Sequence, residues 1–340
     1  MLFKPCLAFA VFLATSTWHL FANALAVRQT EVSERCGNDH IDAATKAHME
    51  ADFKSRRVPP PSDVSSVSRA GPINVFWHVV SNDETPEGGN VPDSAIDEQM
   101  DVLNTAYQGT GLQFQLINVS RTVEPDWSAG ALTDTPLSFE MKAALRKGGG
   151  ADLNIWSCGL TLSSGLLGYA TFPVNLTKEP EKDGVVIRFT TLPGGSSTNF
   201  NLGHTLTHEV GHWVGLLHVF QGRSCTEEGD EVDDTPPQST STSGCPDTKN
   251  SCGAGEEGDL PDSIHNYMDY SHDRCMCEFT NGQVERMHDQ LATYRGIELR
   301  TGPSVGIRRR TRTLRRLLAP SGHGRLQARQ IASQCEGLFP

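Results

Sequence analysis

The sequence predicts an α/β (α+β) fold in which helices lie on a mixed, twisted sheet. Strand-like apolar runs alternate with helical repeats between residues 73 and 200. An irregular segment with several cysteines then extends from about residue 218 to 268, and a last helix follows it. This order favours one α/β layer followed by an irregular, disulfide-tied C-terminal subdomain that ends in a helix.

The elements of the α/β layer are expected in a regular order. The helix over 92–108 is predicted by Ile96, Met100, Leu103 and Tyr107, which are spaced to share one helical face. A short helix over 139–146 should end at the glycines 148–150. Strands are predicted at 73–80, 112–116, 151–157, 163–173 and 185–189.

The two ends of the chain differ in character from this domain. Residues 1–26 contain Lys4, an apolar run and the small-x-small ending Ala24-Leu25-Ala26, which is typical of a cleaved secretory signal. A membrane anchor is the alternative, but polar residues between Thr15 and His19 interrupt the run before the roughly 18 to 20 apolar residues that a spanning helix needs. We therefore expect a secreted, extracellular protein that is not membrane-bound after cleavage.

Three further segments follow from composition. Residues 27–70 are polar and end in three prolines and a serine-rich stretch, as in a pro-segment or linker. The folded domain is expected over 71–297. Residues 298–340 carry nine Arg, no Lys and two Glu, which predicts a basic, disordered tail. The net charge of −12 for the 340 residues argues against a nucleic-acid partner.

Residues 208–218 carry the most informative motif, HExxH followed by GxxH. His208 and His212 lie one helical turn apart and can bind one metal ion. Gly215 is suited to ending the helix with a positive φ, and the resulting turn can bring His218 to the same ion. Asn201 is the predicted N-cap. Leu202, Leu206 and Val210 should form the apolar face that packs on the sheet.

Three neutral imidazoles with one open coordination position are typical of catalytic zinc, since structural sites are closed by four protein ligands. Zinc lowers the pKa of a bound water toward about 7. Glu209 follows the first histidine and is placed to accept that proton as general base. The motif therefore predicts a zinc endopeptidase that hydrolyses extracellular proteins or peptides. A secreted zinc-binding protein that binds peptides in the same cleft without turnover is the alternative.

The extended motif resembles that of the metzincin metallopeptidases, which also have a methionine-containing turn under the metal. Met268 is the candidate for that turn. Four segments are similar to the pappalysin family of metzincins, especially its secreted fungal metalloproteases: 166–173, 233–236, 266–270 and 279–280. The resemblance covers roughly residues 70–297 and implies a metzincin-like zincin fold.

The resemblance also implies roles for individual residues. His208, His212 and His218 would be the zinc ligands and Glu209 the catalytic base. Tyr270 would stand near the metal and stabilise the oxyanion, unless it is an ordinary buried tyrosine. The strand around 168–172 would form the upper rim of the cleft, where a substrate peptide can add as an extra strand.

Eight cysteines remain after signal cleavage, and an oxidising compartment favours disulfides over a zinc cluster. The family pattern implies the pairs Cys225–Cys252 and Cys245–Cys275. Cys36 resembles a cysteine switch, in which a thiolate occupies the open zinc position and keeps a zymogen latent. The alternative is a disulfide from Cys36 to Cys158 or Cys277.

Three remaining features are less specific. The acids of the loop after His218 are either calcium ligands, as in some pappalysins, or a solvated acidic loop. Asn118 and Asn175 begin glycosylation sequons. Thr280 and Gln283 have the spacing of a capping box and should open a last helix that runs to about Tyr294. The acids of the loop after His218 are Glu227, Glu228, Asp230, Glu231, Asp233 and Asp234. The sequence leaves the oligomeric state open.

Overall fold

The structure is a computed structural model that describes residues 35–39, 41–58, 71–163, 165–226, 229–253 and 260–299. The predicted signal at 1–26 and the tail from residue 300 onward lie outside the described residues, as does the stretch 59–70. No helix in the described ranges is long and apolar enough to cross a membrane.

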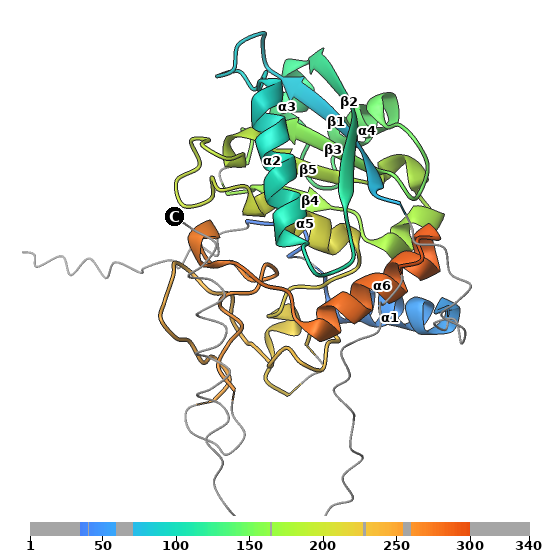
Figure 1. The fold of residues 1–340 in the computed structure, drawn as a ribbon, viewed down its shortest axis with the longest axis vertical. Helices are drawn as coiled ribbons and strands as arrows, with labels where there is room; N and C mark the ends of the chain where they lie inside the picture. The colour runs from blue at the N-terminus through green and yellow to red at the C-terminus, as the bar shows by residue number, and fades with distance from the viewer. Residues whose placement is uncertain are drawn as a thin grey trace, which may run out of the picture. The chain divides into compact units, whose positions relative to one another are not determined.

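A five-stranded mixed sheet forms the centre of the fold (Figure 1). The strand order is β2-β1-β3-β5-β4, and only β4 runs antiparallel to its neighbour. The prediction of helices on a mixed sheet is therefore confirmed. The expected run 163–173 is a strand only at its centre, because Pro173 begins a 3₁₀ helix. The strands are β1 (Ile73–Ser81), β2 (Phe114–Val123), β3 (Leu153–Cys158), β4 (Gly168–Ala170) and β5 (Val185–Arg188).

Helices cover both faces of this sheet. On one face, α2 (Asp93–Ala106) and α5 (His204–Trp213) pack on alternate strand residues such as Trp77 and Ile155. On the other face, α3 (Pro125–Gly130) and α4 (Pro136–Leu145) cover Trp156 and Val186. This alternation follows from the two-residue period of a strand, which sends neighbouring side chains to opposite faces. The described residues also form short 3₁₀ helices: η1 (Pro173–Thr177), η2 (Pro180–Lys182), η3 (Phe189–Thr191), η4 (Gln221–Arg223) and η5 (Asp273–Cys275).

The start of α5 differs from the prediction. Its N-cap is Gly203, with φ +89°, whereas Asn201 donates its side-chain amide to the carbonyl of Gly195 at 2.7 Å. The carboxylate of Asp273 accepts from the backbone N–H of Leu202 at 2.9 Å and from that of His204, the first residue of α5, at 3.4 Å, so a distant residue contacts the start of the helix. Leu202 precedes the helix and is 38% exposed, and the buried apolar face of α5 therefore begins at Leu206.

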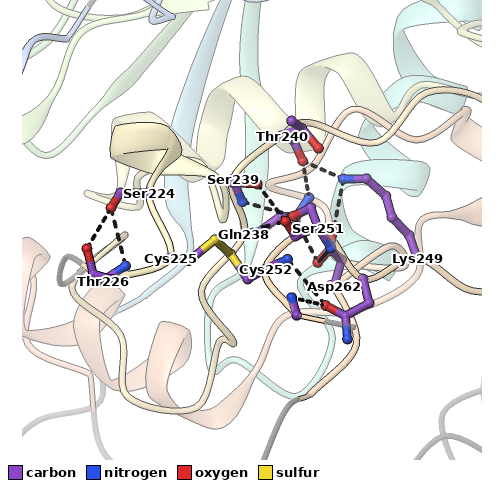
Figure 2. The surroundings of a disulfide bond; sticks show 12 residues. Ser224, Cys225, Thr226, Gln238, Ser239, Thr240, Lys249, Ser251, Cys252 and Asp262 are labelled. Carbon is purple, nitrogen blue, oxygen red and sulfur yellow. Dashed lines mark hydrogen bonds and ion pairs between the residues drawn. A yellow bond between two sulfur atoms is a disulfide. The ribbon is translucent and has the colours of Figure 1, made fainter. Parts of the chain in front are cut away.

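The segment between α5 and the last helix is irregular, and it contains the disulfides Cys225–Cys252 and Cys245–Cys275. These are the two pairings that the family resemblance implies. Polar contacts reinforce the first one (Figure 2). Ser251 accepts from Ser239 N at 2.9 Å, and its own N–H donates to Asp262 Oδ1 at 2.9 Å. Covalent and polar links thus replace the periodic hydrogen bonds that this segment lacks.

The last helix, α6 (Asn281–Arg295), begins as predicted. Thr280 and Gln283 form both hydrogen bonds of a capping box, and Gly296 ends the helix with φ +63°. In Figure 1, α6 lies beside α1 (Ala43–Arg56), which the sequence reasoning did not predict. Asp42 caps α1 through the N–H of Thr45.

Candidate active site

The end of α5 and the turn after it bring three histidines together. His208 and His212 lie on the last turns of α5, and Gly215, with φ +102°, redirects the chain so that His218 returns to them. Nε2 of His218 lies 3.1 Å from Nε2 of His208 and 3.1 Å from Nε2 of His212. All three side chains are buried. The structure therefore places the three predicted ligands around one point.

The donor chemistry of this cluster fits a cation. His208 Nδ1 donates to the carbonyl of Tyr267 at 2.7 Å, and His212 Nδ1 donates to that of Leu216 at 2.8 Å. Burial lowers the pKa of His212 to about 4 and that of His208 well below its ordinary value, so both rings are neutral near pH 7. Their Nε2 lone pairs are consequently directed toward His218 Nε2, and a cation placed among the three rings would be stabilised by them. The site thus has the imidazole donors that zinc prefers.

Cys36 supplies a fourth ligand-type atom from the N-terminal segment. One atom each of Cys36, His208, His212 and His218 lie within 4.8 Å of one another, and this is the one such group found among the described residues. Cys36 and Cys158 are free thiols and Cys277 is disulfide-bonded, so the alternative disulfide from Cys36 to either residue is not formed. Burial raises the pKa of the Cys36 thiol.

Glu209 lies between this thiol and β4. Its Oε2 accepts from Cys36 Sγ at 3.4 Å. Burial raises the pKa of Glu209 to about 8, and the Cys36 hydrogen bond and Arg35 oppose that shift. A Cβ atom on Gly168 would lie 2.8 Å from Glu209 Cγ, so the close approach of β4 to the carboxylate requires glycine at this position.

Met268 lies in a turn under α5. The Met268 side chain is fully buried, and its N–H donates to Asn266 Oδ1 at 2.9 Å. The same turn provides the carbonyl of Tyr267 that orients His208. Asp269 holds the turn from the other side by accepting from Thr242 N at 2.9 Å. The turn is therefore a rigid support for the ligand set.

Tyr270 is 6% exposed, and its hydroxyl is directed at the histidines. Its Oη lies 3.3 Å from His218 Nε2 and donates to Asp39 Oδ1 at 2.5 Å. Asp39 Oδ1 also lies 3.5 Å from His218 Nδ1. The N-terminal segment therefore contacts both the tyrosine and a histidine.

Sequence reasoning missed Asp39, Asp269 and Asp273. Asp273 is fully buried, caps α5 and lies 3.4 Å from the guanidinium of Arg35. Arg35 also donates to the carbonyl of Ser271 at 2.7 Å. Each aspartate is a single acid in an irregular segment, so its local sequence carries no periodic signal. Only their long-range partners reveal their structural roles.

The remaining predicted site residues lie elsewhere. Asn118 on β2 and Asn175 in η1 are exposed, as glycosylation acceptors must be. Asp230 accepts from Thr235 Oγ1 at 2.7 Å and is buried, whereas Asp234 accepts from Gly282 N at 2.9 Å at the start of α6. Asp230, Glu231 and Asp234 are thus used for internal contacts.

Comparison with known proteins supports the chemistry of the site. The M43 peptidase family, described as pregnancy-associated plasma protein-A, matches residues 153–292. An extracellular metalloprotease of Sordaria macrospora is 46% identical over 226 residues, which cover 66% of this chain and 75% of that protein. An extracellular metalloprotease of Arthroderma benhamiae is 42% identical over 278 residues, which cover 79% of this chain and 87% of that protein.

Two solved structures have a similar fold. Promirolysin of Tannerella forsythia has a TM-score of 0.59 and 29% identity, covering 78% of this chain and 97% of that one. Mature mirolysin of Tannerella forsythia in complex with a cleaved peptide has a TM-score of 0.55 and 30% identity, covering 68% of this chain and 97% of that one. Together with the converging histidines, these relationships show that the chain is a zinc metalloprotease that belongs to the pappalysin, or M43, family.

Proposed function

We propose that the protein is a secreted endopeptidase in which His208, His212 and His218 hold zinc and Glu209 is the general base. The observation that carries this proposal is the convergence of three Nε2 atoms next to a buried carboxylate. When bound, zinc supplies a Lewis acid that polarises the scissile carbonyl and lowers the pKa of a water. Glu209 accepts the proton of the attacking water at Oε2 and donates it to the leaving amine.

Tyr270 has the position needed for a supporting role. In this proposal its hydroxyl stabilises the oxyanion once the contact with Asp39 is released, since it already lies within 3.3 Å of a ligand histidine. Asp39 holds the phenol away from that role in the structure described.

The edge of β4 is the proposed position of a substrate peptide. The N-terminal segment shows how this edge accepts a backbone: Leu167 N donates to the carbonyl of Arg35 at 2.8 Å, and Gly37 N donates to that of Gly168 at 2.9 Å. A substrate that replaces residues 35–37 can make the same kind of backbone hydrogen bonds. The scissile bond would then lie beside Glu209.

Residues 27–70 are proposed to be a pro-segment with Cys36 as the cysteine switch. The Cys36 thiol lies in the histidine cluster and donates to the general base, so a substrate and a water are both excluded. The likeness to promirolysin covers 78% of this chain and that to mature mirolysin covers 68%, which supports a precursor form.

Secretion and glycosylation at Asn118 and Asn175 complete the proposal. Mass spectrometry of the exported protein before and after treatment with an N-glycosidase tests both residues. Calcium stays a prediction; a rise in the thermal unfolding midpoint on adding calcium to chelator-treated protein would support it. Unchanged midpoints would favour a solvated acidic loop.

Casein hydrolysis by the processed protein tests the catalytic proposal. We expect activity to be lost with a zinc chelator, restored by zinc, and reduced by several orders of magnitude in Glu209→Gln. Undiminished hydrolysis by the variant would refute the role of Glu209. Zinc binding without hydrolysis in either protein would favour the non-catalytic peptide-binding alternative.

A further inference from the structure

Contacts with α6 and with a loop that contains Gly229 and Glu231 hold α1 near both of its ends. Near its start, Lys46 donates to the carbonyl of Gly229 at 2.6 Å and lies 3.0 Å from Glu231. Near its end, Asp52 accepts from the hydroxyl of Tyr294 at 2.8 Å. Arg57, just after the helix, forms an ion pair with Asp289. The helix is thus fixed at its start by the loop residues Gly229 and Glu231 and at its end by α6.

A buried ion pair lies in the middle of these contacts. Both carboxylate oxygens of Glu50 accept from the guanidinium of Arg286, and the two side chains are 7% and 8% exposed. Nε of Arg286 donates at 2.9 Å to the carbonyl of Gly215, the residue that turns the chain toward His218. While α1 is in place, a change that neutralises Glu50 would leave the Arg286 charge buried without its counterion, which is costly.

The apolar side of α1 packs on a hydrophobic cluster that extends to the ligand histidine His212. Phe53 is 6% exposed and packs with Phe172, Val174, Leu217 and Tyr294. Phe172 also contacts His212 edge-on, with ring centroids 5.2 Å apart. A pocket of about 10 Å³ remains between α1 and the surface that contains Phe172, Val174 and Tyr294, which is about the volume that one water needs. We define the α1 groove as the surface formed by Phe172, Val174, Leu217, Arg286 and Tyr294.

We propose that the α1 groove is a separate binding site for the pro-segment, one that retains residues 35–57 after the chain is cut between residues 59 and 70. This inference rests on the proposed zymogen, but it concerns where the inhibitor is held rather than how zinc is blocked. Its consequence is that a cut in the linker alone leaves a latent, two-chain complex. Release requires a second cut within α1 or between Cys36 and α1.

The argument depends on the short connection between the two binding elements. Cys36 precedes the first residue of α1, Ala43, by only seven positions. While α1 stays in its groove, this connection keeps the thiol at a high local concentration beside the histidines. Each element therefore raises the occupancy of the other, and the pro-segment acts as a bivalent ligand of the domain.

Retention can be measured in the full-length protein carrying Glu209→Gln, which prevents self-cleavage, and the recognition sequence of a site-specific protease inserted after residue 63. After the cut, size-exclusion chromatography and mass spectrometry follow the released N-terminal fragment. We expect the fragment to co-elute with the domain. Glu50→Gln should speed its dissociation by at least about tenfold, because the buried charge of Arg286 loses its partner.

Two controls separate the groove from other causes. Glu98→Gln removes an exposed acid on α2 and should leave retention unchanged. Cys36→Ser should weaken retention less than Glu50→Gln does, because α1 keeps its groove contacts. Should Glu50→Gln fold poorly, Asp52→Asn tests the same surface through the Tyr294 hydroxyl.

The outcomes are distinct. Immediate loss of the fragment after cleavage of the protein that keeps Glu50 would overturn the proposal. Equal dissociation rates in Glu50→Gln and Glu98→Gln would also overturn it. Loss of the fragment in Cys36→Ser alone would assign retention to the thiol and not to the groove. Because retention is measured without catalysis, failure of the proposed protease function would appear only in the casein assay.

Discussion

The sulfur of Met268 fills the space beside Gly211, where an added Cβ atom would lie 2.3 Å from it. Alanine normally stabilises a helix interior relative to glycine by about 1 kcal/mol. Here we expect Gly211→Ala to destabilise the protein by about 1 to 3 kcal/mol, because Met268 is fully buried and must move. Urea unfolding measures the change.

Gly71→Ala is the matched control, since nothing lies within 4 Å of a Cβ atom there. Its unfolding free energy should change by less than about 0.5 kcal/mol. Equal effects at the two positions would contradict the close contact between α5 and the methionine turn.

Cys36→Ser should make the uncut precursor more active. The substitution removes the thiol that lies in the histidine cluster and donates to Glu209, so the base becomes accessible to water more often. We expect at least about a tenfold higher rate of casein hydrolysis by the uncut precursor, because a serine hydroxyl is a much weaker zinc ligand than a thiolate. Cys158→Ser, which alters the other buried free thiol, should stay as latent as the unsubstituted protein. Equal latency of all three precursors would rule out the switch.

Features defined by neighbouring residues were the ones predictable from sequence. The capping box of α6 needs only Thr280 and Gln283, and the turn at Gly215 needs only a glycine that can take a positive φ. The mixed sheet follows from apolar runs whose burial is local to each strand. For the same reason the spacing of the motif predicts that the three histidines converge, as their Nε2 distances of 3.1 Å confirm.

Features defined by distant partners were not predictable. The helix α5 begins after Gly203, where Asp273, far along the chain, accepts from the N–H groups of Leu202 and His204. The helix α1 buries only Glu50 and Phe53, so its sequence lacks a continuous apolar stripe. It is held instead by charges on α6 that are more than 200 residues away. The local sequence favours Asn201 as the N-cap of α5, but the helix begins after Gly203, where it contacts Asp273.

Tyr270→Phe should lower kcat with little change in KM. The hydroxyl lies 3.3 Å from His218 Nε2 and would act on the transition state, whereas the ring that packs against Phe220 is retained. Loss of one oxyanion donor typically reduces kcat by about 10²- to 10³-fold. Tyr169→Phe is the control, because that hydroxyl bonds Ser138 and Ala131 on the other face of the sheet. A change confined to KM, or one shared by both variants, would contradict the proposed role.

The Asp183–Arg295 pair should govern part of the acid stability. Asp183 is fully buried, and its two oxygens each lie 2.9 Å from the guanidinium of Arg295. Burial alone would raise the pKa of this carboxyl, but Arg295 and the hydrogen bonds outweigh it and hold the pKa below the ordinary value of 3.8. A lowered pKa in the folded state means that the stabilisation is complete above about pH 4 and is lost as the pH falls below it.

Asp183→Asn should therefore reduce the free energy of unfolding by about 3 to 5 kcal/mol at pH 7, because Arg295 keeps its buried charge without a counterion. As the pH falls below about 4, the difference between the variant and the unsubstituted protein should shrink, because the carboxyl of the unfolded chain then binds a proton while the native carboxylate, whose pKa is lower, does not. Urea titrations at several pH values, with chelator in every sample, measure both effects. Asp93→Asn removes an acid from the exposed ion pair with Arg121 and should change the unfolding free energy by less than about 1 kcal/mol at pH 7. A difference for Asp183→Asn that stays constant down to pH 3 would mean that this carboxyl does not titrate with folding in that range.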